Sequence, residues 1–126
     1  MVRVIDVHTH MLSHAYMRAL AGDSGGALPY LVGRLDICWD NIPAARAKTA
    51  ERPSNYARRV YADSVVFRQD ALAMAVSVFG TDNVLYGSDY PHTIGDMTGC
   101  LARVDALPGD VREKVRGQTA QRIFRL

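Results

Sequence analysis

The chain of 126 residues has room for one domain with a modest hydrophobic core, since domains typically run to roughly 100–150 residues. Its content of 48% hydrophobic and 22% charged residues is ordinary for a soluble globular protein and excludes a disordered chain. The formal charge is +2 and most basic residues are spread along the chain, so nothing calls for a nucleic-acid partner.

The cysteines and the N-terminus bear on location. Cys38 and Cys100 lie far apart without CxxC spacing, which favours free thiols in a reducing compartment over a disulfide framework. Arg3 and Asp6 interrupt the apolar N-terminal residues, and no apolar run approaches ~18 residues. We therefore expect neither a signal peptide nor a membrane span, and a cytoplasmic location.

The first third of the chain alternates a predicted strand with predicted helices. Residues 2–7 have the β-branched composition of a short buried strand that ends in polar residues. Residues 11–21 have helical character, and residues 22–26 are predicted to be a loop. Residues 27–39 carry apolar side chains at spacings of three and four, which predicts a helix with one apolar stripe.

The middle of the chain has a different composition. Residues 40–55 combine two prolines with small and basic residues, which predicts an irregular surface connection. Residues 56–59 are predicted to add a helical turn, and residues 60–67 have the aromatic and β-branched bias of a strand. The basic residues of this region follow no helical face, so they indicate a solvated connection rather than a nucleic-acid patch.

The clearest pattern lies between residues 70 and 92. Asp70 is predicted to cap a helix that Gly80 ends in a left-handed conformation. One face of this helix carries Leu72, Val76 and Phe79. A turn then leads to a short strand at residues 84–87 and a polar loop at residues 88–92, an order that predicts an α/β unit.

The C-terminal region is predicted to be helical. Residues 97–107 form one expected helix, which Pro108 and Gly109 break. Asp110 and Glu113 have the spacing of a capping box for a last helix that runs towards Phe124.

Three residues form a candidate metal site. Residues two apart in a strand point to the same face, so His8 and His10 can present two imidazoles to one ion where their strand ends. Asp89 also ends a strand and offers a carboxylate of the kind that catalytic zinc sites use beside histidines. The alternatives are that the histidines are ordinary polar residues at a strand end and that Asp89 only caps its loop. Ligands from two strand ends suit the C-terminal edge of a parallel sheet, which favours the metal site.

The string GDSGG at residues 22–26 also surrounds the nucleophile of trypsin-like proteases, with Ser24 in that place. Such proteases need an all-β fold and a histidine and an aspartate well upstream, whereas only twenty-three residues precede Ser24. The loop also lacks the Lys-Ser/Thr of a P-loop. The string therefore predicts neither a protease nor a phosphate site.

Three stretches resemble amidohydrolase-related proteins of the aminocarboxymuconate semialdehyde decarboxylase type: VIDVHTH at residues 4–10, GGALPYLVGRLD at residues 25–36 and VFGTDNVLYGSDYPH at residues 78–92. The resemblance implies an α/β fold, part of a (β/α)8 barrel whose active site lies at the carboxyl ends of its strands. It also implies a divalent metal, usually zinc, and a small carboxylated substrate that is decarboxylated or hydrolysed.

The resemblance assigns roles to single residues. His8, His10 and Asp89 would bind the metal, and Asp89 would also be catalytic. Asp23 stands where the family has a histidine that acts on the substrate, so Asp23 is the second catalytic candidate. Arg34 matches an arginine that reaches a substrate carboxylate across a subunit interface, although an exposed helix arginine is the alternative; His92, three residues after Asp89, is the other substrate-binding candidate.

The chain is much shorter than such a barrel, which needs roughly 200 residues or more. We expect one truncated domain over residues 1–126, with the first strand and helix in residues 1–21 and the C-terminal part of the barrel in residues 22–126. The retained strands would resemble the first, seventh and eighth of the family, and their open edges predict a homo-oligomer. Two functions stay open: a metal-dependent lyase or hydrolase, and a non-catalytic, degenerate α/β fragment that self-associates or binds a partner.

Overall fold

The computed structural model describes residues 4–6, 27–47 and 49–126 of the chain. In chain order the elements of this part are α2 (Leu28–Asn41), α3 (Pro43–Arg46), α4 (Pro53–Ala57), β1 (Ala62–Asp63), α5 (Gln69–Phe79), β2 (Val84–Leu85), α6 (Met97–Asp105), α7 (Gly109–Glu113), the π-helical turn η2 (Lys114–Gln118) and α8 (Thr119–Phe124).

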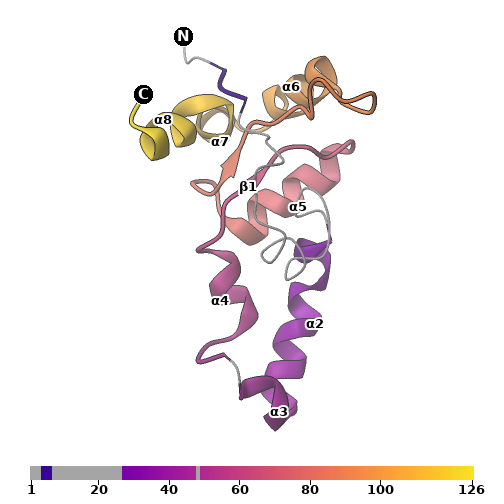
Figure 1. Cartoon of the computed structure of the whole chain (residues 1–126), viewed down its shortest axis with the longest axis vertical. Coiled ribbons are helices and arrows are strands. Elements are labelled where there is room, and N and C mark those ends of the chain that lie inside the picture. The colour runs from indigo at the N-terminus through magenta and orange to yellow at the C-terminus, as the bar shows by residue number, and fades with distance from the viewer. Residues whose placement is uncertain (1–3, 7–26, 48) are drawn as a thin grey trace.

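A β-α-β unit lies at the centre of the molecule. The short strands β1 and β2 pair in parallel, with Ala62 opposite Val84 and Asp63 opposite Leu85. Parallel strands need a crossover connection, and α5 provides it. This is the α/β arrangement that the sequence predicted, and it brings the carboxyl ends of both strands to the same edge (Figure 1).

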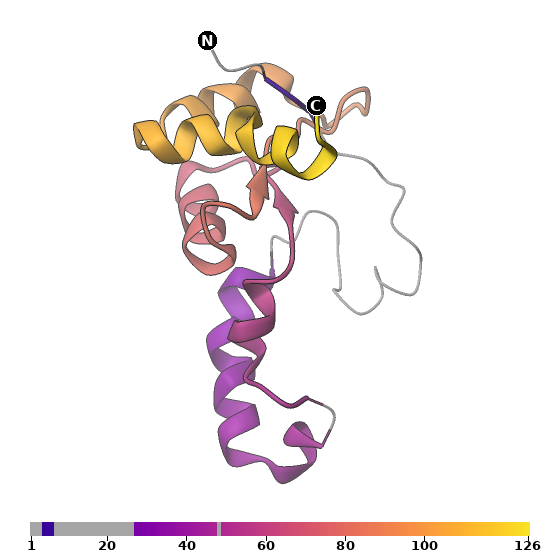
Figure 2. The same ribbon diagram turned by 90° about the vertical axis from the view of Figure 1, so that its left-hand side faces the viewer.

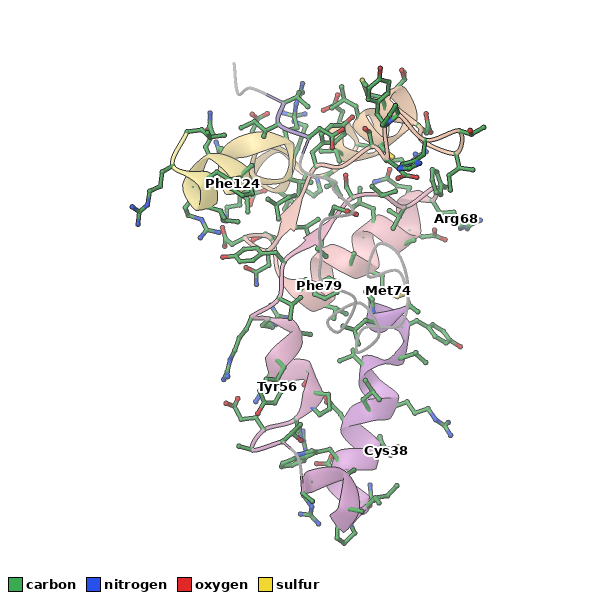
Figure 3. The ribbon with its side chains drawn as sticks, viewed as in Figure 1. Cys38, Tyr56, Arg68, Met74, Phe79 and Phe124 are labelled. Atoms are coloured by element: carbon green, nitrogen blue, oxygen red, sulfur yellow. The ribbon has the colours of Figure 1, made fainter. Side chains whose placement is uncertain are left out.

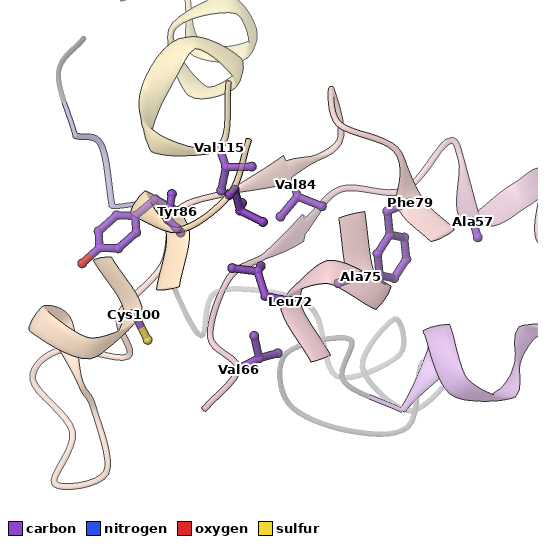
Figure 4. Packing of buried hydrophobic residues seen from close by; sticks show 11 residues of the cluster. Ala57, Val66, Leu72, Ala75, Phe79, Val84, Tyr86, Cys100 and Val115 are labelled. Atoms are coloured by element: carbon purple, nitrogen blue, oxygen red, sulfur yellow. The ribbon is translucent and has the colours of Figure 1, made fainter. Parts of the chain in front are cut away.

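The hydrophobic core forms where α5 meets β2 and the C-terminal helices. Leu72, Ala75 and Phe79 recur at spacings of three and four residues, so they share the face of α5 that is buried. Figure 4 shows this face beside Val84 of β2 and Val115 of η2. Burial of this apolar surface is the main force that holds the unit together.

The C-terminal helices cover the sheet at one end of the molecule. The last three, α7, η2 and α8, follow one another without a break from Gly109 to Phe124, and η2 contacts β2, α6 and both of its neighbours (Figure 1). Val115 and Gly117 of η2 are buried. The π-helical turn therefore lies against the strand that leads to Asp89.

An arm of helices α2, α3 and α4 extends from the other end of the unit (Figures 1 and 2). Helices α2 and α4 lie side by side, and Figure 3 labels Cys38 on the first and Tyr56 on the second. The Asp36 carboxylate accepts a hydrogen bond of 2.9 Å from the Ser54 amide, and the Trp39 indole donates to the Thr49 carbonyl at 3.3 Å. Polar contacts therefore hold the parts of the arm together. Several large apolar residues of the arm are exposed: Tyr30, Leu31, Leu35, Ile37 and Ile42.

Two predictions for the middle of the chain are wrong. Residues 40–55 are not irregular throughout, because α2 continues to Asn41 and both α3 and α4 begin with proline in their first turn. Proline suits this position because the first helical amides need no intrahelical acceptor. The strand expected over residues 60–67 is limited to Ala62–Asp63, since these are the two residues that pair with β2.

Two predicted caps are also wrong. Arg68, not Asp70, is the N-cap of α5, and Asp70 lies in the first turn. The N-cap of α7 is Pro108, and no side chain caps this helix, so Asp110 and Glu113 form no capping box. Helix α5 does end before Gly80, whose φ of 97° favours glycine, but its ψ of 152° is not that of the predicted left-handed conformation.

The predictions for the N-terminal strand, the cysteines and a membrane span have different outcomes. Of the strand expected over residues 2–7, the described residues 4–6 belong to no regular strand, although the Ile5 amide donates to the Arg116 carbonyl at 2.9 Å. Cys38 and Cys100 are both free thiols, as predicted. No helix in the described ranges has the length and apolar character needed to cross a bilayer.

Candidate functional site

Asp89 lies just after β2, at the edge of the sheet where both strands end. The chain from Val84 to Asp89 is buried throughout, and Asp89 itself is only 6% exposed. Its φ of 59° is in the left-handed region, which aspartate tolerates better than most residues but which still costs free energy. A buried carboxylate in such a conformation is held by its surroundings, a feature that clusters at functional sites.

Backbone hydrogen bonds fix the loop that carries Asp89, residues 88–96 (the 88–96 loop). The His92 amide donates to the Asp89 carbonyl at 2.9 Å, and the Asp96 amide donates to the Ser88 carbonyl at 3.0 Å. Gly95 packs directly against the same loop, since a Cβ there would lie 2.5 Å from the Asp89 carbonyl oxygen. Only glycine permits this close approach, which keeps the loop closed on itself.

The N-terminal segment reaches the same place. The hydroxyl of Ser88, a fully buried residue, donates a short hydrogen bond to the carboxylate of Asp6. The same hydroxyl oxygen accepts a hydrogen bond of 3.2 Å from the Tyr90 amide. Residues 4–6 therefore lie against the residue that precedes Asp89.

A second buried serine joins the two strand ends. Ser64 follows β1, and its hydroxyl oxygen accepts a hydrogen bond of 3.1 Å from the Gly87 amide and donates to the Gly87 carbonyl at 3.3 Å. These contacts continue the link between the strands beyond the two paired residues of each. The start of the 88–96 loop is therefore fixed to the end of β1 as well as to β2.

Tyr86 lies between the core and the polar edge. Its side chain is buried at the margin of the core cluster, with the hydroxyl pointing away from the other core residues (Figure 4), and this hydroxyl donates to the Met97 carbonyl at 3.0 Å. Burial raises the pKa of the Tyr86 hydroxyl to about 12, and the nearby negative charge of Asp6 acts in the same direction. Tyr86 is therefore a neutral hydrogen-bond donor at physiological pH.

Asp96 ends the loop and begins α6. Its carboxylate caps the helix by accepting a hydrogen bond of 2.8 Å from the Gly99 amide, and it forms an ion pair of 2.9 Å with Arg103. The hydrogen bond from Arg103 and the capping bond hold the pKa of the Asp96 carboxyl below its usual range. Both ends of the 88–96 loop are thus fixed to regular structure.

The structure brings together only some of the predicted site residues. Asp89 and His92 share one loop, although His92 is exposed. Arg34 is exposed on α2, in the arm that extends away from the C-terminal helices (Figure 2). His8, His10 and Asp23 lie outside the described residues. Within the ranges that are described, no three or more His, Cys, Asp or Glu residues gather as a metal site would require.

The sequence interpretation assigned no role to four residues that shape this region: Asp6, Ser64, Ser88 and Asp96. Asp96 had a usable signal, because an acidic residue just before a predicted helix is a common N-cap. Asp6 also had one, since it is two residues before His8 and so shares its face in an extended segment. Ser64 and Ser88 had none, because their partners are distant in the sequence.

Comparison with known proteins gives consistent matches. A family model described as Amidohydrolase matches residues 39–126. The chain is 27% identical over 93 residues, 73% of its length, to the 2-amino-3-carboxymuconate-6-semialdehyde decarboxylase of Dictyostelium discoideum. Among solved structures, the 5-carboxyvanillate decarboxylase of Sphingomonas paucimobilis superposes with a TM-score of 0.66 at 31% identity over 81% of the chain. A dihydroxybenzoic acid decarboxylase from Polaromonas, solved with bound manganese, gives a TM-score of 0.63 at 24% identity over 81% of the chain and shares the fold.

The chain corresponds to a part of these proteins. It spans 23% of the Dictyostelium decarboxylase and 32% of each of the two solved decarboxylases. The predicted fold class is confirmed at this level: the α/β unit superposes on a portion of the (β/α)8 barrel of amidohydrolase-family decarboxylases. Which strands of the barrel it retains stays a prediction.

Proposed function

The chain belongs to the amidohydrolase family, and from that premise we propose that it supplies part of a divalent-metal site for the decarboxylation of a small carboxylated aromatic compound. The observation that carries the proposal is Asp89: a buried carboxylate in a left-handed conformation, in a closed loop at the carboxyl end of a parallel strand. In (β/α)8 barrels this edge of the sheet is where active sites lie.

The proposed ligands form a donor set that fits a metal. A carboxylate from the 88–96 loop and two imidazoles from residues 8 and 10 are a donor set that zinc and manganese both accept. The segment that leads to those histidines contacts Ser88, directly before Asp89. The proposed ligands are therefore His8, His10 and Asp89. When bound, the ion would act as a Lewis acid that polarises a substrate oxygen.

Decarboxylation requires that the bond between the ring carbon and its carboxylate breaks and that the ring carbon, which retains the electron pair, takes up a proton. We assign the transfer of this proton to Asp89 or Asp23, and the binding of substrate carboxylates to Arg34 and His92. Hydrolysis of a small carboxylated substrate uses the same groups with water as the nucleophile. Arg34 lies on α2, in the arm, so its role in this proposal depends on a neighbouring chain.

One observation favours a second function. The chain spans about a third of the length of the solved decarboxylases that it matches. The second candidate is a non-catalytic, degenerate α/β fragment that self-associates or binds a partner. Metal binding separates the two candidates before any turnover is measured.

The test is titration of the metal-free chain with Zn²⁺ and with Mn²⁺ by calorimetry, followed by assay of carbon dioxide release from 5-carboxyvanillate. We expect one ion bound per chain and loss of that binding in His8→Ala and Asp89→Asn. Asp110→Asn, an exposed aspartate of α7, is the matched control and retains the metal. Unchanged metal content in both His8→Ala and Asp89→Asn would remove the proposal, and metal binding without carbon dioxide release would favour the non-catalytic candidate.

A further inference from the structure

Hydrogen bonds attach residues 4–6 to two later parts of the described chain. The Ile5 amide donates to the Arg116 carbonyl at 2.9 Å, and the Asp6 carboxylate accepts a hydrogen bond from the Ser88 hydroxyl, 82 residues away. Arg116 belongs to the π-helical turn η2, which packs against β2. Both attachments therefore hold residues 4–6 beside the strand that leads to Asp89.

Ser88 is placed to connect this segment with the 88–96 loop. The residue is fully buried, and its hydroxyl donates to Asp6 while it accepts from the Tyr90 amide at 3.2 Å. Its carbonyl accepts from the Asp96 amide at 3.0 Å. Ser88 thus contacts the N-terminal segment and both ends of the loop that presents Asp89.

We propose that Asp6 and Ser88 are positioning residues, and that their hydrogen bond (the Asp6–Ser88 pair) sets the register between the N-terminal segment and Asp89. The role in metal binding rests on the proposed function above, whereas the hydrogen bond itself does not. Asp6 is two residues from His8, and Ser88 adjoins Asp89. Residues 6 and 8 are joined by two peptide units, which span at most about 7 Å. The Asp6–Ser88 pair therefore limits how far the backbone at residue 8 can separate from the backbone at Asp89.

The alternative is that the Asp6–Ser88 hydrogen bond stabilises the fold but has no effect on the metal site. It predicts that removal of the hydrogen bond lowers stability but leaves the affinity and the geometry of a bound ion unchanged. A positioning role predicts a change in both. The discriminating variants are Ser88→Ala and Asp6→Ala, with Asp6→Asn as the conservative variant, because its amide oxygen still accepts the Ser88 hydrogen bond. Ser77→Ala, at an exposed serine of α5, is the control.

The first measurement needs no metal: amide hydrogen exchange of the full chain, with the amides of α5 as an internal reference for folding. We expect the Ile5 amide to exchange roughly threefold to tenfold faster in Ser88→Ala and in Asp6→Ala, the effect of one typical hydrogen bond. Asp6→Asn and Ser77→Ala should match the unmodified chain. Asp6 is exposed, so Asp6→Ala keeps the measurement decisive if Ser88→Ala fails to fold. An unchanged Ile5 amide in Asp6→Ala overturns the pair.

The second measurement uses Co²⁺ as the probe, because its visible absorption reports the geometry of its ligands. We expect Ser88→Ala and Asp6→Ala to bind Co²⁺ at least threefold more weakly with an altered spectrum, and Asp6→Asn to restore both. If those variants match the unmodified chain in affinity and spectrum, the positioning role is wrong. If the unmodified chain binds no Co²⁺, the proposed function fails, and the exchange measurement still decides whether the Asp6–Ser88 pair sets the register.

Discussion

Three residues at the polar edge of the sheet make the contacts that define the candidate site. Tyr86, Ser88 and Asp89 follow β2 in one short buried stretch, yet each meets a different surrounding. Tyr86 reaches the Met97 carbonyl, Ser88 reaches Asp6, and Asp89 is enclosed by its own loop. Each of these residues can therefore be tested by a substitution that leaves the others in place.

Tyr86 predicts a loss of stability in strong base. The unfolded tyrosine ionises near its ordinary pKa of 10.0, whereas burial raises the pKa in the folded chain to about 12. Between these values the unfolded chain releases the proton and the folded chain retains it, so stability falls as pH rises, in total by roughly 2–3 kcal/mol. Tyr86→Phe should be about 1 kcal/mol less stable at neutral pH through the lost hydrogen bond, but should lack this added fall. Urea unfolding at a series of pH values between these two pKa values measures the free energy of unfolding of both chains. The same dependence on pH in both chains would contradict the prediction.

Gly95 predicts that the 88–96 loop has no room for a side chain. A Cβ in Gly95→Ala would lie 2.5 Å from the Asp89 carbonyl oxygen, so the backbone must shift, at a cost on the order of 1–3 kcal/mol. Gly33→Ala is the matched control, because no atom lies within 4 Å of its Cβ and alanine favours the helix by about 0.5–1 kcal/mol. Chemical unfolding of both variants gives the comparison, and equal stabilities would show that the loop moves freely.

At the scale of elements, the sequence pattern predicts a helix or strand correctly where interactions between residues close in the sequence determine it. Helix α5 and its end at Gly80 followed from an apolar stripe and a glycine, and both are present. The prolines of α3 and α4 were interpreted as breaks, although they occupy first helical turns. The strand over residues 60–67 was overestimated, because β propensity does not say how many residues find a partner.

The sequence predicts only part of the candidate site. The position of Asp89 after a strand predicts its place, and the structure puts it at the expected edge. The contacts of Ser88 with Asp6 and of Ser64 with Gly87 join residues 82 and 23 positions apart, and no short motif encodes such pairs. His8, His10 and Asp23 lie outside the described residues, so their roles remain predictions.

The N-terminus of α6 predicts a pH-dependent contribution to stability. Asp96 accepts from the Gly99 amide and pairs with Arg103, which holds the pKa of its carboxyl below the ordinary value. This contribution is present above the ordinary carboxyl pKa and is lost as pH falls through the lowered value. Asp96→Ala should therefore unfold at lower urea concentration at neutral pH, and the difference should shrink in acid. Asp70→Ala, which removes an exposed first-turn carboxylate of α5, is the control with a smaller effect. A difference that is constant with pH would assign the effect to lost packing.

At the scale of the whole molecule, the described chain matches a portion of a (β/α)8 barrel and leaves large apolar side chains exposed. The sheet of the described residues consists of β1 and β2 alone, and it spans far fewer strands than closure requires. The arm exposes large apolar side chains, among them Tyr30 at 79% and Ile37 at 62%. Exposed apolar surface and unpaired strand edges both favour association.

We therefore expect the chain to self-associate through the arm. Size-exclusion chromatography with light scattering should give a mass above that of a single chain. Ile37→Lys should shift the protein towards the single-chain mass, because a charge on this exposed face opposes burial. Ala102→Lys, on an exposed position of α6, should leave the mass unchanged. A single-chain mass at all concentrations, together with cooperative unfolding, would disprove self-association.

The attachment of residues 4–6 also constrains the order of events during synthesis. The Ile5 amide meets the Arg116 carbonyl, so this contact forms only after the ribosome has released nearly all of the chain described above. Until then the β-α-β unit and α6 can assemble from contacts that are closer in the sequence, and such local contacts form fastest. The N-terminal segment is thus the first part of these 126 residues to be made and one of the last to reach its place.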